Sequence, residues 1–178
     1  MSRKIEQTYI IKASPPAVWR ALTNPKEIEK WSGAWAHFVP QAGTEYAFWN
    51  GDIGGVVVEA VPHKKLVQTW KPENWSRTDS VVTFTLSALK GGTRVDLLHE
   101  NVEDWDYDAT SEGWDVYYLG EIKRMLEARG AEDAKGRTTK SAKVRAAEDA
   151  KERAAKDAKT RRAKGAKKKR ARRAGSAK

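Results

Sequence analysis

The distribution of aromatic residues constrains this chain more than any other feature. All 16 aromatic residues, all 6 prolines and all 3 histidines lie before residue 119, whereas residues 129–178 are mostly Ala, Lys and Arg. A segment without large apolar side chains cannot bury enough surface to offset the entropy lost on ordering a core. The sequence therefore predicts one folded domain over residues 1–129 and a separate basic tail over residues 130–178.

The charge is divided in the same way. Residues 1–128 contain 14 Lys and Arg against 18 Asp and Glu, whereas residues 129–178 contain 20 against 6. The formal net charge of +10 is therefore a property of the tail, and the body is mildly acidic. Binding to nucleic acid or another polyanion is expected only from the tail.

Several classes of protein are excluded by composition. The chain contains no cysteine, which rules out disulfides, thiolate catalysis and cysteine-ligated zinc or iron–sulfur sites. The first residues lack the apolar region of a secretory signal, and no run of 18 apolar residues is present to span a membrane. We therefore expect a cytoplasmic protein, associated with the nucleoid if the tail binds nucleic acid.

Hydrophobic periodicity in the body predicts a sheet-rich fold. Alternating β-forming residues predict a first strand over residues 5–12. Two short helices are expected next, at 16–22 and 26–31, with Ser14 capping the first of them. The further predicted strands cover residues 44–49, 53–61, 65–71, 79–89 and 93–99, with hairpin turns at 50–52 and 90–92.

The periodicity changes after the last strand. Trp114, Tyr118 and Ile122 fall at helical spacing, which predicts an amphipathic helix from residue 111 to about residue 129. The candidate caps of this helix are Thr110 and Ser111.

The order of these elements predicts an α+β fold of the helix-grip type. A curved antiparallel sheet of about six strands would wrap on the long C-terminal helix, because no other element is long enough to cover its apolar face. The two short helices would follow the first strand, and the tail would be disordered or partly helical. The cleft between sheet and helix is the natural position for a ligand.

Several motifs recur along the body in a fixed order, at residues 10–23, 55–59, 62–70, 82–86, 92–99 and 113–114. This pattern resembles the SRPBCC superfamily (START-like, birch-pollen-allergen-like), and the resemblance covers roughly residues 5–127. Within it, the chain is most similar to the group named after the activator of the 90-kDa heat-shock protein ATPase.

The resemblance implies the helix-grip fold and leaves several functions open. Members of the superfamily include lipid carriers, polyketide cyclases, hydrolases and co-chaperone domains, so the fold alone does not select one. The resemblance to the activator group implies a chaperone partner and a role in the stress response.

The body has more aromatic side chains than a core of this size needs. Most of them are expected to pack in the core, and the others to line a cavity and contact an apolar ligand. Trp35, Phe38 and Trp75 lie in predicted loops and are candidate lid residues. The predicted ligand-binding set is Trp35, Phe38, Phe48, Trp70, Trp75, Phe84, His99, Trp114, Tyr117 and Tyr118.

The sequence shows no catalytic constellation, and enzymatic activity stays open. His99 ends a strand and faces the space between sheet and helix, where it would be either a buried structural histidine or an acid–base group. The histidines lack the spacing of a metal site. The acidic segment 100–108 lacks the central Gly and closing Glu of a calcium loop, so it is predicted as a solvated loop. No metal or cofactor is expected.

The tail is rich in helix-forming residues. A quasi-repeat at 132–135, 148–151 and 156–159, with acid before base at i,i+4, predicts an exposed helix over about 142–164. Its basic end is similar to the Ala/Lys-rich tails of linker histones. The predicted nucleic-acid-binding residues are Arg161, Arg162, Lys164, Lys167, Lys168, Lys169, Arg170, Arg172 and Arg173. The alternatives are a merely solubilising tail and an anionic membrane surface.

Three functional hypotheses follow for the whole chain. The first is a domain that binds a small, mostly apolar ligand between sheet and helix, with a tail that binds nucleic acid without sequence preference. The second is an interaction module related to the chaperone activators, acting through its surface. The third is an enzyme of the cyclase type, using His99 or a cavity tyrosine.

Overall fold

The computed structural model describes the backbone of residues 3–174 and the side chains of residues 3–153 and 156. The chain forms two compact units, Met1–Ala131 and Glu132–Lys178. The first unit carries the whole sheet and the second is helical. No described helix is long and apolar enough to cross a membrane.

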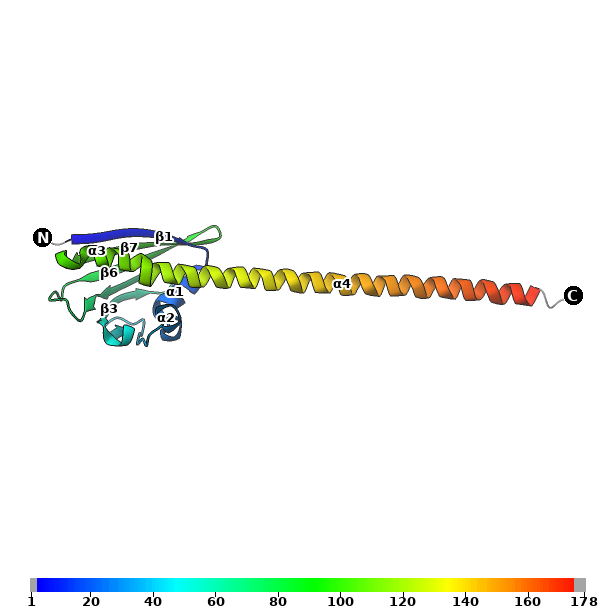
Figure 1. Ribbon diagram of the computed structural model, residues 1–178, viewed down its shortest axis with the longest axis horizontal. Coiled ribbons are helices and arrows are strands. Elements are labelled where there is room, and N and C mark those ends of the chain that lie inside the picture. The colour runs from blue at the N-terminus through cyan, green and yellow to red at the C-terminus, as the bar shows by residue number, and fades with distance from the viewer. Residues whose placement is uncertain (1–2, 175–178) are drawn as a thin grey trace. The chain divides into compact units, whose positions relative to one another are not determined.

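A seven-stranded antiparallel sheet forms the body. Its strands are β1 (Arg3–Ile11), β2 (Glu45–Phe48), β3 (Ile53–Val61), β4 (Lys65–Thr69), β5 (Lys71–Pro72), β6 (Val81–Leu89) and β7 (Gly92–Val102). Their order across the sheet is β1-β7-β6-β4-β3-β2, and the short β5 pairs with β3. Figure 1 shows β1, β7 and β6 side by side with α3 lying along them. The predicted fold class is confirmed, with one strand more than expected.

Two short helices, α1 (Pro15–Thr23) and α2 (Pro25–Ser32), connect β1 to the rest of the sheet. Each begins with a proline, whose missing N–H costs nothing in a first turn. The side chain of Asn24 caps α2 by accepting hydrogen bonds from the backbone N–H of Lys26 and Glu27. Ser14 precedes α1, but its side chain makes no capping hydrogen bond, so that predicted role is wrong.

The long helical region begins earlier than predicted. It consists of η2 (Asp104–Asp106), α3 (Tyr107–Gly113), the π-helical turn η3 (Trp114–Tyr118) and α4 (Leu119–Ala174). Thr110 and Ser111 therefore lie inside a helix rather than at its cap, and part of the predicted acidic loop is helical. Negative side chains are favourable at the positive end of a helix, so the acidic run suits a helix start.

The inner face of the long helical region supplies a large part of the core. The buried residues on this face are Trp114, Tyr118, Leu119, Ile122 and Leu126.

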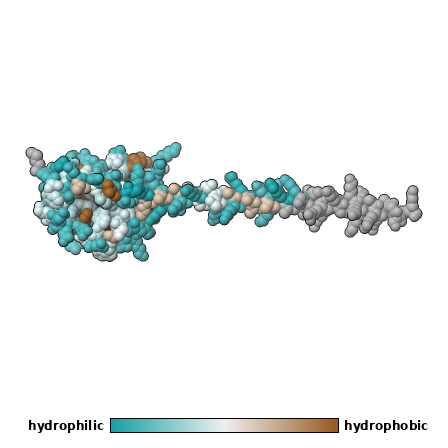
Figure 2. Space-filling model, in the orientation of Figure 1, coloured by the Kyte–Doolittle hydropathy of each residue, from teal (hydrophilic) through white to brown (hydrophobic). Residues whose placement is uncertain are grey.

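Three hydrogen bonds join the helical region to β1 and the residue that follows it. Gln7 Nε2 donates to Ser111 O (2.9 Å), Lys12 N–H to Glu127 Oε1 (3.0 Å), and Lys123 Nζ to Ile10 O (2.9 Å). The helix is thus fixed along β1 as well as through the core. On the face drawn in Figure 2, the surface of this unit is mostly hydrophilic, with only small separate aliphatic patches.

An ion-pair group joins the start of α4 to α2. Arg129 and Lys30 both donate to the carboxylate of Glu27. Burial alone would raise the pKa of Glu27, but the two cations more than offset this effect, so its pKa lies below its ordinary value.

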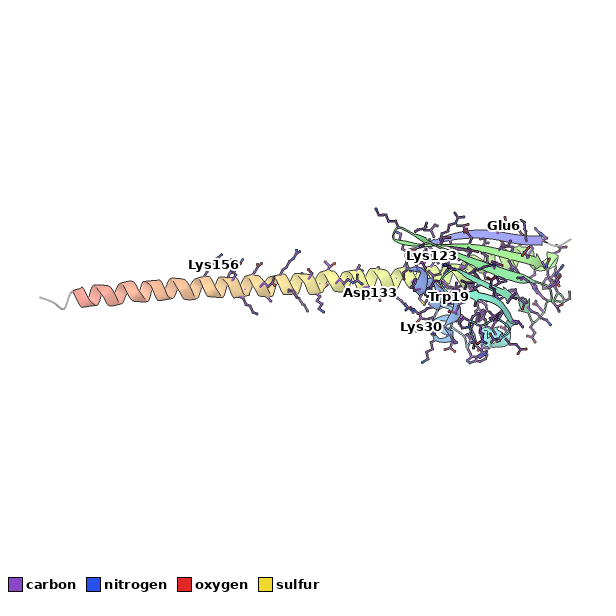
Figure 3. The ribbon with its side chains drawn as sticks, turned by 180° about the vertical axis from the view of Figure 1, so that it is seen from behind. Glu6, Trp19, Lys30, Lys123, Asp133 and Lys156 are labelled. Carbon is purple, nitrogen blue, oxygen red and sulfur yellow. The ribbon has the colours of Figure 1, made fainter. Side chains whose placement is uncertain are left out.

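The second unit is helical without a core of its own. Helix α4 covers the predicted segment 142–164 and extends beyond it on both sides. Every described side chain from Glu132 to Arg153 is exposed. Lys156, labelled in Figure 3, pairs with Glu152 at 2.8 Å, as the i,i+4 spacing predicts. Helix propensity and such pairs stabilise this segment, since no apolar face is buried.

Gly120 is required by the π-helical turn. A Cβ atom at this position would lie 1.8 Å from the backbone carbonyl oxygen of Asp115, which is too close for any side chain. At Gly113, by contrast, the nearest atom to an added Cβ is Tyr117 Cδ2 at 3.9 Å, an ordinary contact. An alanine side chain would therefore clash with the backbone at position 120 but would fit at position 113.

We predict opposite effects for the same substitution at these two positions. Gly120→Ala should lower the free energy of unfolding by about 2 kcal/mol or more, because the backbone must shift. Gly113→Ala should raise it by about 0.5–1 kcal/mol, because alanine favours the helix and restricts the unfolded chain. Urea unfolding of both variants measures the difference. Equal effects at the two positions would contradict the π-helical geometry.

Candidate functional site

A cavity of about 420 Å³ lies between the sheet side of the body and the segment from Asp106 to Tyr118. Its aromatic lining residues are Trp49, Trp70, Trp114, Tyr117 and Tyr118. The other apolar lining residues are Ile53, Pro72, Ala109 and Gly113, and the polar ones are Asp52, Asp106 and Thr110. The lining is therefore mostly apolar and contains neither Lys nor Arg.

Helical spacing explains one wall of the cavity. Trp114, Tyr117 and Tyr118 are related by i, i+3 and i+4, which places them on one side of the helix. Their burial differs, since Trp114 is buried whereas Tyr117 is 65% exposed. Tyr117 thus marks the solvent-facing part of the lining and Trp114 the inner part.

Tyr118 is the centre of the aromatic cluster. Its ring centroid lies 4.6 Å from that of Trp31, 4.9 Å from Trp114 and 5.7 Å from Phe84. Its hydroxyl is buried without a hydrogen-bond partner among the described residues. Burial raises the pKa of Tyr118 well above its ordinary value. The hydroxyl is therefore neutral.

Two acidic residues line the cavity, one from the turn before β3 and one from the start of the helical region. Asp106, on the helical side, accepts hydrogen bonds at Oδ2 from Trp75 Nε1 (2.7 Å) and Thr110 Oγ1 (3.2 Å). Asp52 lies just before β3 and joins its neighbours through its backbone N–H, which donates to the carbonyl of Trp49. The carboxylate of Asp106 is thus held in place by Trp75 and Thr110, whereas Asp52 is positioned by the backbone turn that carries it.

His99 lies in the core and does not line the cavity. Trp114 Nε1 donates to His99 Nδ1 at 3.2 Å, and an indole N–H can only donate, so the ring proton sits on Nε2. Nε2 then donates to the hydroxyl of Ser80 at 2.8 Å. That hydroxyl is 3.2 Å from the carbonyl of Glu100 and donates to it. The chain of hydrogen bonds joins the helix to β7.

Burial in this network lowers the pKa of His99 to about 3. The ring is therefore neutral at ordinary pH, and it packs between Trp75, stacked at 5.9 Å, and Trp114. Of the two roles expected for His99, this geometry favours the structural one. A neutral, enclosed ring outside the cavity is poorly placed for acid–base chemistry on a ligand.

The structure brings four of the ten predicted ligand-binding residues to the cavity: Trp70, Trp114, Tyr117 and Tyr118. Phe48, Phe84 and His99 are buried in the core outside the lining.

The three candidate lids fall outside the lining as well. Trp35 is exposed, whereas Phe38 and Trp75 are 2% and 3% exposed. Phe38 and Trp75 therefore pack in the core and do not border the cavity. Their loops fold back into the core, where Phe38 stacks on Phe48 and Trp75 bonds to Asp106.

Sequence analysis missed Trp49, Asp52, Ile53, Pro72, Asp106, Ala109, Thr110 and Gly113. Half of this set lies between residues 106 and 113, in or next to the segment predicted as a loop. Positions 106, 109, 110, 113, 114 and 117 repeat at helical spacing. This spacing indicates a helix whose one face carries the lining residues. The acidic composition of the segment suggests a solvated loop instead, so the helical pattern is easily missed.

Two further predictions concern metals and the tail. Among the described residues, no group of three or more His, Asp or Glu side chains could hold a metal ion. The side chains of the nine predicted nucleic-acid-binding residues, from Arg161 to Arg173, lie outside the described residues.

Comparison with known proteins agrees with the fold and the motifs. The family model described as "Activator of Hsp90 ATPase homolog 1-like protein" matches residues 12–127. The chain belongs to this family. A relative from Dictyostelium discoideum, the activator of 90 kDa heat shock protein ATPase homolog, is 29% identical over 117 residues, covering 65% of this chain and 30% of the relative. The chain spans only about a third of the length of its curated relatives.

Solved structures of family members share the architecture. An HSP90 activator from Plasmodium falciparum has a TM-score of 0.62 at 25% identity, covering 71% of this chain and 96% of its own. The Aha1 dimer from Colwellia psychrerythraea has the same TM-score and identity, covering 70% and 96%. In both cases the match covers nearly the whole of the other chain, so the shared architecture extends over that entire chain.

The neutral state of His99 predicts a pH dependence of stability. The folded pKa, about 3, lies below the ordinary value of 6.5, so the unfolded chain binds the proton more readily. Stability is fully present above about pH 6.5 and falls as the pH drops towards 3, by about 1.4 kcal/mol per pH unit. Urea unfolding between pH 6.5 and 5 measures the contribution of His99 to the pH dependence with little contribution from carboxylates, because most of them titrate at lower pH.

Removal of an exposed histidine provides the control. His37→Gln should leave the slope unchanged, because His37 lies on the surface. Nuclear magnetic resonance of the His99 ring should show the Nε2–H tautomer throughout this range. A ring that gains a proton above pH 5 while the chain stays folded would contradict the network.

Proposed function

We propose that the body binds a small, mostly apolar ligand in the cavity between the sheet and the helix. The observation that carries the proposal is the cavity itself, about 420 Å³ and bordered by five aromatic side chains. Ligand cavities in proteins commonly measure roughly 300–1,000 Å³, with mostly apolar walls and a few polar groups. The volume and the lining both match that description.

The exposure of the lining supports access from solvent. Tyr117 is 65% exposed while Trp114 and Tyr118 are buried, so the lining runs from the surface into the core. A planar ligand entering past Tyr117 would meet the rings of Trp49, Trp70 and Trp114. Aromatic side chains offer a large contact area at a low entropic cost because they have few rotatable bonds.

We further propose that the tail binds nucleic acid without sequence preference, in the cytoplasm or on the nucleoid. Its support is the charge distribution, since residues 129–178 carry 20 basic against 6 acidic side chains. A dense series of Lys and Arg displaces counterions from phosphates and so binds any sequence. The acidic body would add nothing to this attraction.

The alternative function is chaperone activation through the surface of the body. Its support is the name of the relatives, which are activators of the 90-kDa heat-shock protein ATPase. The matched part covers only about a third of those proteins. The face drawn in Figure 2 has no large aliphatic patch of the kind that marks stable protein interfaces. The cyclase-type hypothesis would use His99 or a cavity tyrosine. His99 does not line the cavity, whereas Tyr117 and Tyr118 do, so this hypothesis now depends on the tyrosines.

Binding of N-phenyl-1-naphthylamine, a neutral apolar dye that fluoresces in dry cavities, tests the first proposal. The full chain should bind it, and Tyr117→Ala should weaken binding roughly fivefold, since an aromatic contact contributes about 1 kcal/mol. Tyr117 is exposed, so the variant should fold normally. Trp105→Ala is the matched control, because Trp105 is also exposed, at 63%, but does not line the cavity.

Two results would overturn the ligand proposal. Absence of dye binding by a folded chain would exclude a working cavity. Equal loss in the Tyr117 and Trp105 variants would place the dye elsewhere on the surface. Stimulation of a purified 90-kDa heat-shock protein ATPase by the same preparation would then select the alternative.

The tail proposal is tested by the salt dependence of binding. If the tail contacts about 6 phosphates, the affinity of the full chain for double-stranded DNA should fall with a log–log slope near −5 in salt. Replacing the nine basic residues of 161–173 by Gln should remove most of this slope. Fluorescence anisotropy at several salt concentrations measures it. A slope that the Gln variant retains would assign DNA binding to another surface.

A further inference from the structure

We propose that the ligand of this cavity is an organic cation, a positively charged nitrogen that carries apolar substituents. The inference rests on the proposed function, since it concerns the same cavity. It goes further by assigning a charge to a ligand that the apolar lining alone leaves undefined.

The aromatic lining is the first observation behind this assignment. Three tryptophans and two tyrosines border one cavity, and the faces of aromatic rings carry partial negative charge. A cation near such faces is attracted by the ring quadrupoles, most strongly by tryptophan. Nitrogens with alkyl groups suit such walls because their charge is spread and weakly hydrated. A lining of aliphatic side chains would give no such preference.

The two carboxylates are the second observation. Asp52 and Asp106 are both among the residues that line the cavity. Asp106 is held by Trp75 and Thr110, both of which bond to Oδ2. Neither carboxylate forms an ion pair within the described part of the chain. Their charge is therefore not neutralised by the protein.

The absence of basic side chains from the lining determines which sign of charge the cavity favours in a ligand. All twelve residues that border the cavity are neutral or acidic. A neighbouring hollow shares Asp52 and adds Glu73, so the negative potential continues beyond the cavity. An anionic ligand would be repelled, and a neutral ligand would gain no electrostatic attraction from the two carboxylates. A cation is the ligand that both the carboxylates and the aromatic rings attract.

A matched pair of probes separates charge from shape. Benzyltrimethylammonium and neopentylbenzene have nearly the same shape, and they differ in a charged nitrogen against a neutral carbon. Each is used to displace N-phenyl-1-naphthylamine from the full chain. We expect the cation to displace the dye at a concentration at least tenfold lower than the neutral isostere.

A pair of substitutions assigns this preference to the cavity. Asp52→Asn should weaken the cation about fivefold to tenfold and leave the isostere unchanged. The side chain of Asp52 makes no hydrogen bond with the described residues, so its loss should not disturb the fold. Glu45→Gln removes the same charge from an exposed position on β2, outside the cavity. It should leave both probes unchanged.

The possible outcomes separate this inference from the proposed function. Dye binding with equal displacement by both probes, or stronger displacement by the isostere, would overturn the cation and keep the cavity. A preference for the cation that Asp52→Asn leaves intact would also overturn the assignment. Absence of dye binding altogether would overturn the proposed function, and the inference with it.

Discussion

The contact between Trp114 and the sheet is the interaction on which the rest of the structure depends. The indole N–H donates to His99, and the ring packs 4.7 Å from Trp70 and 4.9 Å from Tyr118. One side chain thus joins β7, the end of β4 and the π-helical turn. Because the helix covers the apolar inner face of the sheet, this contact orients the largest part of the core.

The core and the cavity lining share residues at this contact. Trp70, Trp114 and Tyr118 belong both to the core and to the cavity lining. A substitution at any of them would change the fold and the site together. Tyr117 and Asp52, which line the cavity from less buried positions, allow the two properties to be separated.

Different forces stabilise the two units of the chain. The first buries a continuous apolar core, and hydrophobic burial dominates its stability. The second exposes every described side chain and depends on helix propensity and on pairs such as Glu152–Lys156.

The sequence by itself determined the fold class of the body and the extent of its apolar part. The alternation of apolar residues in the strands and the helical spacing of Trp114, Tyr118 and Ile122 are local patterns. They predict the strands and the helix without any knowledge of tertiary contacts. Tertiary structure alone decided which aromatic residues border the cavity. Trp75 and Phe38 lie in loops whose path depends on distant partners, Asp106 and Phe48. Local sequence does not encode such long-range contacts. The tertiary structure likewise decides which side chains bond to His99, and it leaves the carboxylate of Asp52 without a side-chain hydrogen bond among the described residues.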